Sequence, residues 1–112
     1  MTHTIEDDPD RRATRALSKL LFGGAGYRIE IGAAIAELRR VNTTELADQL
    51  DVARQSVNQE LRVLEHAGLL RRIRRRGKGR AVFFAPQRSG YWRWCSEAQA
   101  KAVEMLERAP RF

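Results

Sequence analysis

The chain has 112 residues and a formal net charge of +7, with 21 Lys and Arg against 14 Asp and Glu. A chain of this length forms one domain with a modest core, and its 43% apolar content excludes a wholly disordered protein. No apolar run approaches the roughly 20 residues that cross a bilayer, and the acidic N-terminus lacks the features of a secretory signal.

Cysteine usage and charge distribution narrow the location and the partners. Cys95 is the single cysteine, which excludes an internal disulfide and suits a reducing compartment, so we expect a cytoplasmic protein. Residues 1–10 hold four acids and no Lys or Arg, so the rest of the chain carries a net charge of +11. A basic body of this size is typical of nucleic-acid binders. Charge alone also fits a membrane surface, but we expect no membrane partner.

The N-terminal part predicts a tail followed by a helix. Residues 1–10 are expected to form a disordered acidic tail, and Asp10 is expected to cap the next helix. Apolar residues recur at helical spacing within 11–22. Three glycines then end this helix: Gly23, Gly24 and Gly26.

A second helix is predicted from Tyr27 to Arg39, with Ile31, Ile35 and Leu38 on its inner face. Gly32 weakens this helix by about 1 kcal/mol relative to alanine. Its missing side chain would permit close packing against another helix.

Two further helices flank a short turn. Asn42 and Glu45 have the spacing of a capping box and predict a helix over 43–50. The turn Asp51-Val52-Ala53 interrupts the apolar pattern, and a longer helix follows over 54–66.

The pattern changes after Gly68, which is expected to end the preceding helix in a left-handed conformation. Two short apolar segments, 69–73 and 80–85, predict a β-hairpin with a glycine-containing tip. Residues 71–80 contain seven cations and no acid. A last helix is predicted to begin near Ser89 or Ser96, to contain 90–108 and to stop at Pro110.

The helix pair 43–50 and 54–66 has the properties needed to place a helix in the major groove of DNA. Its inward positions are apolar, and the second helix offers outward amide and guanidinium groups, which pair with adenine and guanine. The cations of the hairpin can reach phosphates or a minor groove. The candidate DNA-binding residues are Thr43, Arg54, Gln55, Ser56, Asn58, Gln59, Arg62, Arg74, Arg76, Lys78 and Arg80.

Three motifs carry a family resemblance: L-F-G-G at 21–24, T-T-E-L-A-D-Q-L at 43–50, and R-Q-S-V-N-Q-E-L-R-V-L-E-H-A-G-L-L at 54–70. With them, residues 20–85 resemble a winged helix–turn–helix domain of the ArsR/MarR-like bacterial regulators. The resemblance implies a mainly α fold with a small β-hairpin as the wing. It also implies a sequence-specific DNA-binding homodimer, usually a repressor, that dimerises through its terminal helices.

The chain departs from the family pattern in its turn, where Asp51-Val52-Ala53 replaces the frequent Gly-Val-Ser. Asp51 tolerates a left-handed backbone, but Ala53 cannot cap the next helix, which costs about 1 kcal/mol. Metal-sensing members carry a cysteine motif before the recognition helix. Residues 42–53 contain no Cys or His, so metal sensing is not carried over and no metal or cofactor is expected.

We therefore expect an acidic tail over 1–10, a winged helix–turn–helix domain over 11–88 and a C-terminal dimerisation helix over 89–112. A 12.8 kDa monomer would have few places to bury the apolar face of that helix. The candidate dimer-interface residues are Leu17, Leu20, Trp92, Cys95, Ala102, Met105 and Leu106.

Plainer alternatives stay open for several residues. His66 suits the negative end of a helix, or it serves as a ligand. Cys95 is a packing or dimer residue, or a redox sensor. The stripe of Tyr91, Trp92, Trp94, Met105 and Leu106 belongs to the core or a dimer interface, or it lines a ligand pocket. The basic hairpin and the polar helix face can each be ordinary solvated surface.

Three functions compete at this point. The first is a sequence-specific regulator that binds double-stranded DNA and represses through operator occlusion by a dimer, with an unknown effector. The second is a protein–protein adaptor, and the third is a nonspecific architectural nucleic-acid binder. No enzyme motif is present, so catalysis is not expected.

Overall fold

The computed structural model describes residues 8–73 and 82–108, which form a mainly helical protein with one small antiparallel sheet. This confirms the expected fold class. The elements are α1 (Pro9–Leu21), α2 (Arg28–Leu38), α3 (Thr43–Leu50), α4 (Arg54–His66), β1 (Leu70–Ile73), β2 (Phe83–Pro86), α5 (Gly90–Ala100) and α6 (Ala102–Arg108).

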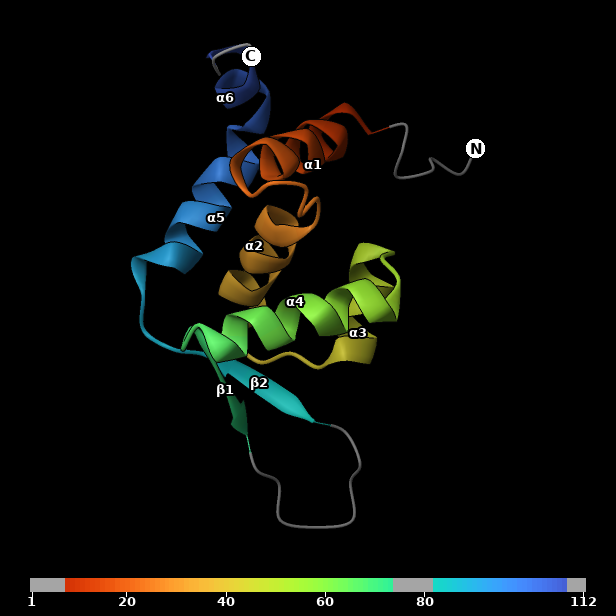
Figure 1. Cartoon of the computed structure of the whole chain (residues 1–112), viewed down its shortest axis with the longest axis vertical. Helices are drawn as coiled ribbons and strands as arrows, with labels where there is room; N and C mark the ends of the chain where they lie inside the picture. Colours follow the sequence, from red (N-terminus) through yellow and green to blue (C-terminus); the bar gives the residue numbers. More distant parts are fainter. Residues whose placement is uncertain (1–7, 74–81, 109–112) are drawn as a thin grey trace.

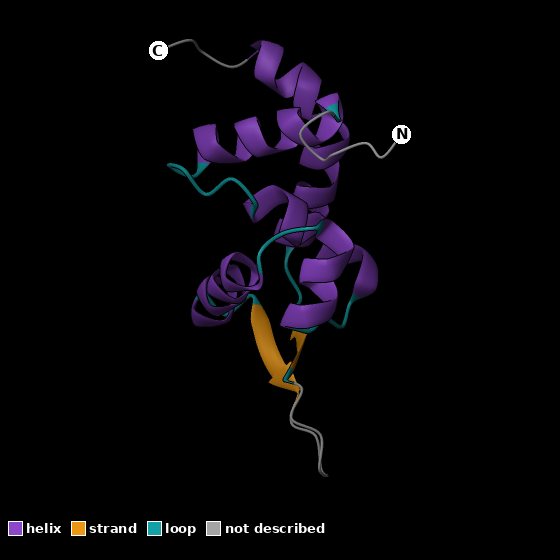
Figure 2. Cartoon of the chain, turned by 90° about the vertical axis from the view of Figure 1, so that its right-hand side faces the viewer, coloured by secondary structure: helices purple, strands orange, loops and turns teal. Residues whose placement is uncertain are grey.

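Helix α2 lies at the centre of the molecule, and the other elements surround it (Figure 1). Helix α5 packs along α2, α1 packs against α6, and α3 pairs with α4. The β1–β2 hairpin projects from the end of the molecule opposite α1 and α6 (Figures 1 and 2). The helix–turn–helix pair α3 and α4, here named the HTH pair, therefore lies at the same end of the molecule as the hairpin. The terminal helices α1 and α6 lie at the other end.

Helix α1 begins earlier than the sequence predicted. Its N-cap is Asp8, whose carboxylate accepts hydrogen bonds from the amides of Asp10 at 3.0 Å and Arg11 at 3.4 Å. Pro9 occupies the first turn, where its fixed φ suits a helix and its missing amide costs nothing. The prediction that Asp10 caps this helix was wrong, because Asp10 already lies inside the first turn.

Helix α2 is buried on nearly all sides. Ile31 and Ile35 are fully buried, as predicted, but Leu38 is 43% exposed, so its predicted inward position was wrong. The reason is that α2 ends at once after Leu38, where Arg39 adopts a left-handed backbone with φ 62°. The last turn therefore points away from the core.

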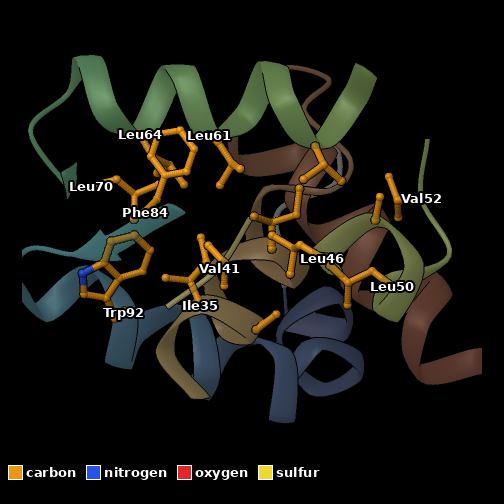
Figure 3. Close-up of a cluster of buried hydrophobic side chains, with 14 residues drawn as sticks. Ile35, Val41, Leu46, Leu50, Val52, Leu61, Leu64, Leu70, Phe84 and Trp92 are labelled. Carbon is orange, nitrogen blue, oxygen red and sulfur yellow. The ribbon is translucent and has the colours of Figure 1, made fainter. Parts of the chain in front are cut away.

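Two apolar clusters contain side chains of this central helix. The larger cluster joins α2 to the HTH pair, the hairpin and the start of α5 (Figure 3). It includes Ile35, Leu46, Leu61, Phe84 and Trp92. The smaller cluster joins α2 to the terminal helices through Ile29, Leu17, Ala98 and Ala102.

The close packing suggested for Gly32 is confirmed. A methyl group at this position would place its carbon 3.0 Å from Cβ of Cys95, and closer still to the sulfur. Cys95 is fully buried on the facing side of α5. Because Gly32 has no side chain, the two helix backbones can approach each other at this point.

The predicted single helix over 90–108 is two helices. Helix α5 ends at Ala100 with Lys101 as its C-cap, and α6 begins at Ala102 and packs against α1. The two halves therefore pack against different helices, α5 against α2 and α6 against α1.

This break corrects the reasoning about the apolar face. Trp92 and Cys95 are buried in their own chain beside α2, and Ala102 and Leu17 are buried where α6 meets α1. The monomer therefore has room for these side chains without a partner. Of the remaining candidates, Leu20 is 45% exposed. Met105 and Leu106 are half-buried.

We expect Gly32→Ala to destabilise the fold. Alanine favours a helix by about 1 kcal/mol over glycine, but overpacking a tight core typically costs 1–3 kcal/mol, so a net loss on the order of 1 kcal/mol is expected. Urea denaturation followed by circular dichroism measures it. Gly90→Ala is the matched control, since nothing lies within 4 Å of its Cβ position. A Gly32→Ala protein as stable as wild type would contradict the tight contact.

Candidate nucleic-acid interface

The helix–turn–helix forms as its local sequence predicts. Asn42 caps α3 by accepting a hydrogen bond from the Glu45 amide at 2.7 Å. Asp51 ends α3 in a left-handed conformation with φ 52°, and Val52 turns into the core. Ala53 precedes α4 without a side-chain cap, as its missing hydroxyl predicts.

Helix α4 is held by its apolar side. Val57, Leu61 and Leu64 are buried in the larger cluster. The candidate DNA-binding residues lie on the remaining faces: Arg54, Gln55, Gln59 and Arg62 are exposed, and Ser56 and Asn58 are half-buried. His66 is exposed in the last turn, where a cation suits the helix dipole.

The polar surface of α4 borders three hollows. Thr43, Asn58 and Arg62 line one groove, here named the wing groove, between the start of α3, α4 and the hairpin. Ser56 and Gln59 line another hollow, beside the α1–α2 loop. A third hollow, on the outer face of α4, is lined by Gln55, Asn58, Gln59 and Arg62 together with His66. Because Asn58 and Arg62 also line the wing groove and Gln59 also lines the second hollow, the predicted residues of α4 adjoin one another across the three hollows.

The wing groove also contains residues that sequence reasoning missed. Thr44 and Arg72 line it together with the predicted residues. Thr44 lies two residues after the cap residue Asn42, in the first turn of α3, so its position at the start of this helix could have indicated it from the sequence. In the sequence, nothing distinguishes Arg72 from the other cations of residues 71–80. Only the strand register shows which side of the hairpin it occupies.

The hairpin is antiparallel and pairs Leu70 with Pro86 and Arg72 with Phe84. Val41 adds an isolated bridge to Phe84, with the amide–carbonyl distances 3.0 and 2.8 Å. Leu70 and Phe84 are the buried strand residues, whereas Ile73 is half-buried. The predicted wing residues Arg74, Arg76, Lys78 and Arg80 lie outside the described residues.

An ion pair joins the end of α4 to the hairpin. Nε of Arg72 donates to Oε2 of Glu65 at 2.7 Å, and this bond raises the pKa of the Arg72 side chain. The same guanidinium lies 5.5 Å from the ring centroid of Phe84. Since Phe84 is part of the core, Arg72 connects α4, β1 and β2.

Two buried carboxylates fix the other elements around α4. Glu60 of α4 accepts hydrogen bonds from Arg28 of α2 at 2.8 and 3.4 Å. Glu30 of α2 is paired with Arg11 at 3.1 Å and Arg15 at 3.3 Å, both from α1. Arg11 also donates to the carbonyl of Leu50 at 2.6 Å, which reaches the end of α3.

The cysteine and the aromatic stripe belong to the core. Burial raises the pKa of the Cys95 thiol to about 11, so the thiol is protonated at neutral pH and poorly reactive. Trp92 donates its indole N–H to the Gln87 carbonyl at 2.8 Å, and Trp94 packs edge-on against Phe22 at 5.9 Å. Within residues 8–73 and 82–108, no group of three or more potential metal ligands forms. No helix in these ranges is long and apolar enough to cross a membrane.

Comparison with known proteins agrees with this geometry. Residues 25–73 match the family model described as a helix-turn-helix domain. This range contains α2, α3, α4 and β1. The chain therefore contains a helix-turn-helix domain over this range. No curated protein matches its sequence significantly.

Solved structures extend the likeness to nearly the whole chain. The adhesin competence repressor AdcR from Streptococcus pyogenes matches with a TM-score of 0.63 at 16% identity, covering 95% of this chain and 81% of AdcR. A MarR mutant from E. coli complexed with operator DNA gives 0.62 at 16% identity, covering 88% and 72%. The antimony-specific transcriptional repressor AntR gives 0.58 at 22% identity, covering 84% and 79%. At these identities the likeness establishes the winged helix–turn–helix fold.

The Glu65–Arg72 pair generates a stability prediction. Glu65→Gln and Arg72→Gln should each lower the free energy of unfolding, and the double variant should lose less than the sum. A coupling of about 0.2–1 kcal/mol is expected for a partly exposed pair, and 1 M NaCl should reduce it. Urea denaturation of the four proteins measures it.

Arg71→Gln is the control, because neighbouring strand residues point to opposite faces. Additive losses for Glu65 and Arg72 would mean that the pair does not couple α4 to the hairpin.

Proposed function

We propose that this chain is a sequence-specific regulator of transcription that binds double-stranded DNA, acts as a homodimer and represses by covering its operator. The single observation that carries the proposal is the outward, hydrogen-bonding and non-acidic face of α4, held by a buried apolar face in a helix–turn–helix. The operator complex of the similar MarR mutant supports the same partner. The role is one of binding and not of catalysis, and a cytoplasmic location goes with a DNA target.

Base reading is assigned to α4. Its amide side chains, Gln55, Asn58 and Gln59, can each form two hydrogen bonds to an adenine edge, and its arginines can do so with guanine. Asn58 and Arg62 share the wing groove with Thr43, so the start of α3 would sit on the phosphates beside the bases that α4 reads.

Phosphate binding is assigned to the wing on the basis of its charges. Residues 71–80 hold seven cations, and such a run is self-repulsive unless an anion is nearby. Arg74, Arg76, Lys78 and Arg80 would lie along phosphates or in a narrow minor groove.

The proposed homodimer uses the end of the molecule that α1 and α6 share. Leu20 and Leu21 of α1 and Val103 of α6 are exposed apolar residues at this end. Met105 and Leu106 are half-buried beside them in the smaller cluster. A C2 dimer through these helices would hold two α4 helices toward successive major grooves, about 34–36 Å apart.

The adaptor alternative loses its main support. It rested on an unexplained apolar C-terminal helix, and that helix is buried against α2 by Trp92 and Cys95. The architectural alternative still fits the cations. It differs from our proposal in requiring equal affinity for every duplex, whereas an effector, if one acts, is compatible with both.

The test of base reading begins with selection of bound duplexes from a random pool. Asn58→Ala, Gln55→Ala and Gln59→Ala should each weaken binding to the selected operator by roughly 1–3 kcal/mol, and binding to random DNA much less. Fluorescence anisotropy measures both affinities. Gln99→Ala, an exposed amide of α5, is the control and should change neither. Equal weakening on every duplex would show that this face does not read sequence.

The wing should behave differently in the same assay. Replacing Arg76, Lys78 and Arg80 with alanine removes phosphate contacts, so it should weaken operator and random DNA together. The slope of log K against log salt should flatten by about 2–3 units. An unchanged slope would make the wing a solvated loop.

The dimer is tested by sedimentation equilibrium at micromolar concentration. We expect twice the chain mass of 12.8 kDa for the wild type and a shift toward the monomer for Leu20→Glu. Leu38→Glu is the matched control, because Leu38 is similarly exposed but lies at the far end of α2. A wild-type protein of single-chain mass would refute the dimer.

A further inference from the structure

A second basic surface lies beyond the hairpin, where the C-terminal end of α2 meets the N-terminal end of α5. It is a groove, here named the flank groove, and three arginines line it: Arg39, Arg88 and Arg93. Gln87 and Ser89 add polar groups to its wall. No acidic side chain is among the described residues that line it. Neither the helix–turn–helix nor the wing accounts for this concentration of positive charge.

The position of these cations is unfavourable for the isolated protein. Arg88 and Arg93 flank the start of α5, and the N-terminal end of a helix carries a partial positive charge that repels cations. The first turn of α5 contains no acid to offset them. Arg93 has a partner in Glu97 at 3.4 Å, but both side chains are mostly exposed, so the pair is weak.

Arg39 makes the convergence of charge stronger. As the C-cap of α2 it is well placed for the dipole of that helix, yet it faces the two cations of α5 across the groove. Three like charges around one groove repel one another unless an anion lies between them. The arrangement therefore lowers the stability of the free chain, and a negatively charged partner would relieve the repulsion.

The flank groove lies close along the chain to the proposed DNA interface. Phe84 lines the wing groove, and Arg88 follows it by four residues. The segment between them is fixed, because the Gln87 amide donates to the Leu69 carbonyl at 2.8 Å and Trp92 binds the Gln87 carbonyl. Four extended residues span at most about 13 Å. At a rise of about 3.4 Å per base pair, this is roughly four base pairs of duplex.

We propose that the flank groove binds backbone phosphates of the duplex up to about four base pairs outside the segment that α4 reads. This inference rests on the proposed function and extends the contacted length of the operator. The contact adds affinity without sequence preference, since phosphates carry no sequence information. It also explains why Arg88 and Arg93 occupy the unfavourable end of α5.

The test compares two duplexes that contain the same selected operator, one trimmed to the core and one extended by six random base pairs at each end. Wild-type protein should bind the extended duplex more tightly and with a steeper salt dependence. The variant Arg39→Gln/Arg88→Gln/Arg93→Gln should lose this gain but keep its affinity for the core. Three lost contacts per chain correspond to about 2.7 units of salt slope, or about 40-fold in affinity over a fourfold change in salt.

The control variant removes three charges elsewhere: Arg12→Gln/Lys101→Gln/Arg108→Gln. It is closely matched, because Lys101 is also a helix C-cap and Arg108 also pairs with an acid four residues away, Glu104. The control should retain the gain from extension. Thermal melting adds a second readout: the flank-groove variant should be as stable as wild type or more stable, since like charges have been separated.

The outcomes separate the two proposals. If wild type binds the core operator but gains nothing from extension, the flank contact is refuted and the proposed function stands. If wild type distinguishes no sequence, the proposed function itself fails. Equal losses in the two triple variants would reveal a general charge effect and overturn the inference. A second result would also overturn the inference. If the flank-groove variant keeps its affinity for the extended duplex but loses the ability to bind polyglutamate, the groove binds an acidic protein and not DNA.

Discussion

The close contact of α2 with α5 at Gly32 is the constraint on which the rest of the fold depends. Helix α2 contributes to both apolar clusters, so its neighbours must cover it on every side. A side chain at position 32 would push α5 outward at Cys95 and loosen Trp92, one turn nearer the hairpin. The hairpin and the HTH pair are thus held against one helix whose burial depends on a missing side chain.

Charged groups set the orientation of the recognition helix within this apolar frame. Burying a carboxylate is costly unless it is paired, and pairs of this kind do little for net stability. Glu60 and Arg28 nevertheless join α4 to α2, and Glu65 and Arg72 join the end of α4 to the hairpin. Each pair has a direction and a length that apolar contacts lack, so together they restrict how α4 can rotate and slide.

The sequence was most informative where one local interaction decides the structure. The cap of Asn42 defined the start of α3, and the apolar spacing of α4 gave both of its ends as observed. Asp51 took the left-handed turn that its side chain allows. These features depend on residues within one or two turns of each other.

Prediction failed where distant residues decide. The break at Lys101 arises because α5 packs on α2 while α6 packs on α1, and one continuous apolar stripe contains no sign of two partners. Arg72 and Thr44 were missed for a similar reason, since the wing groove exists only once Val41 bridges to Phe84 and brings α3 beside the hairpin. The tip of the wing lies outside the described residues, so the roles of its cations rest on charge alone.

The arginines of this chain fall into two groups according to what surrounds them. Arg11, Arg15 and Arg28 meet buried carboxylates of other elements, and their charges are used to hold helices together. Arg88 and Arg93 instead lie at the end of a helix that disfavours them, and Arg39 faces them across a groove without a described acid. Charge that lowers the stability of a free protein is maintained when a bound state uses it. The first group of arginines stabilises the fold, and the second group is the one that we propose binds an anion. This second group extends the basic surface beyond α4 and the wing.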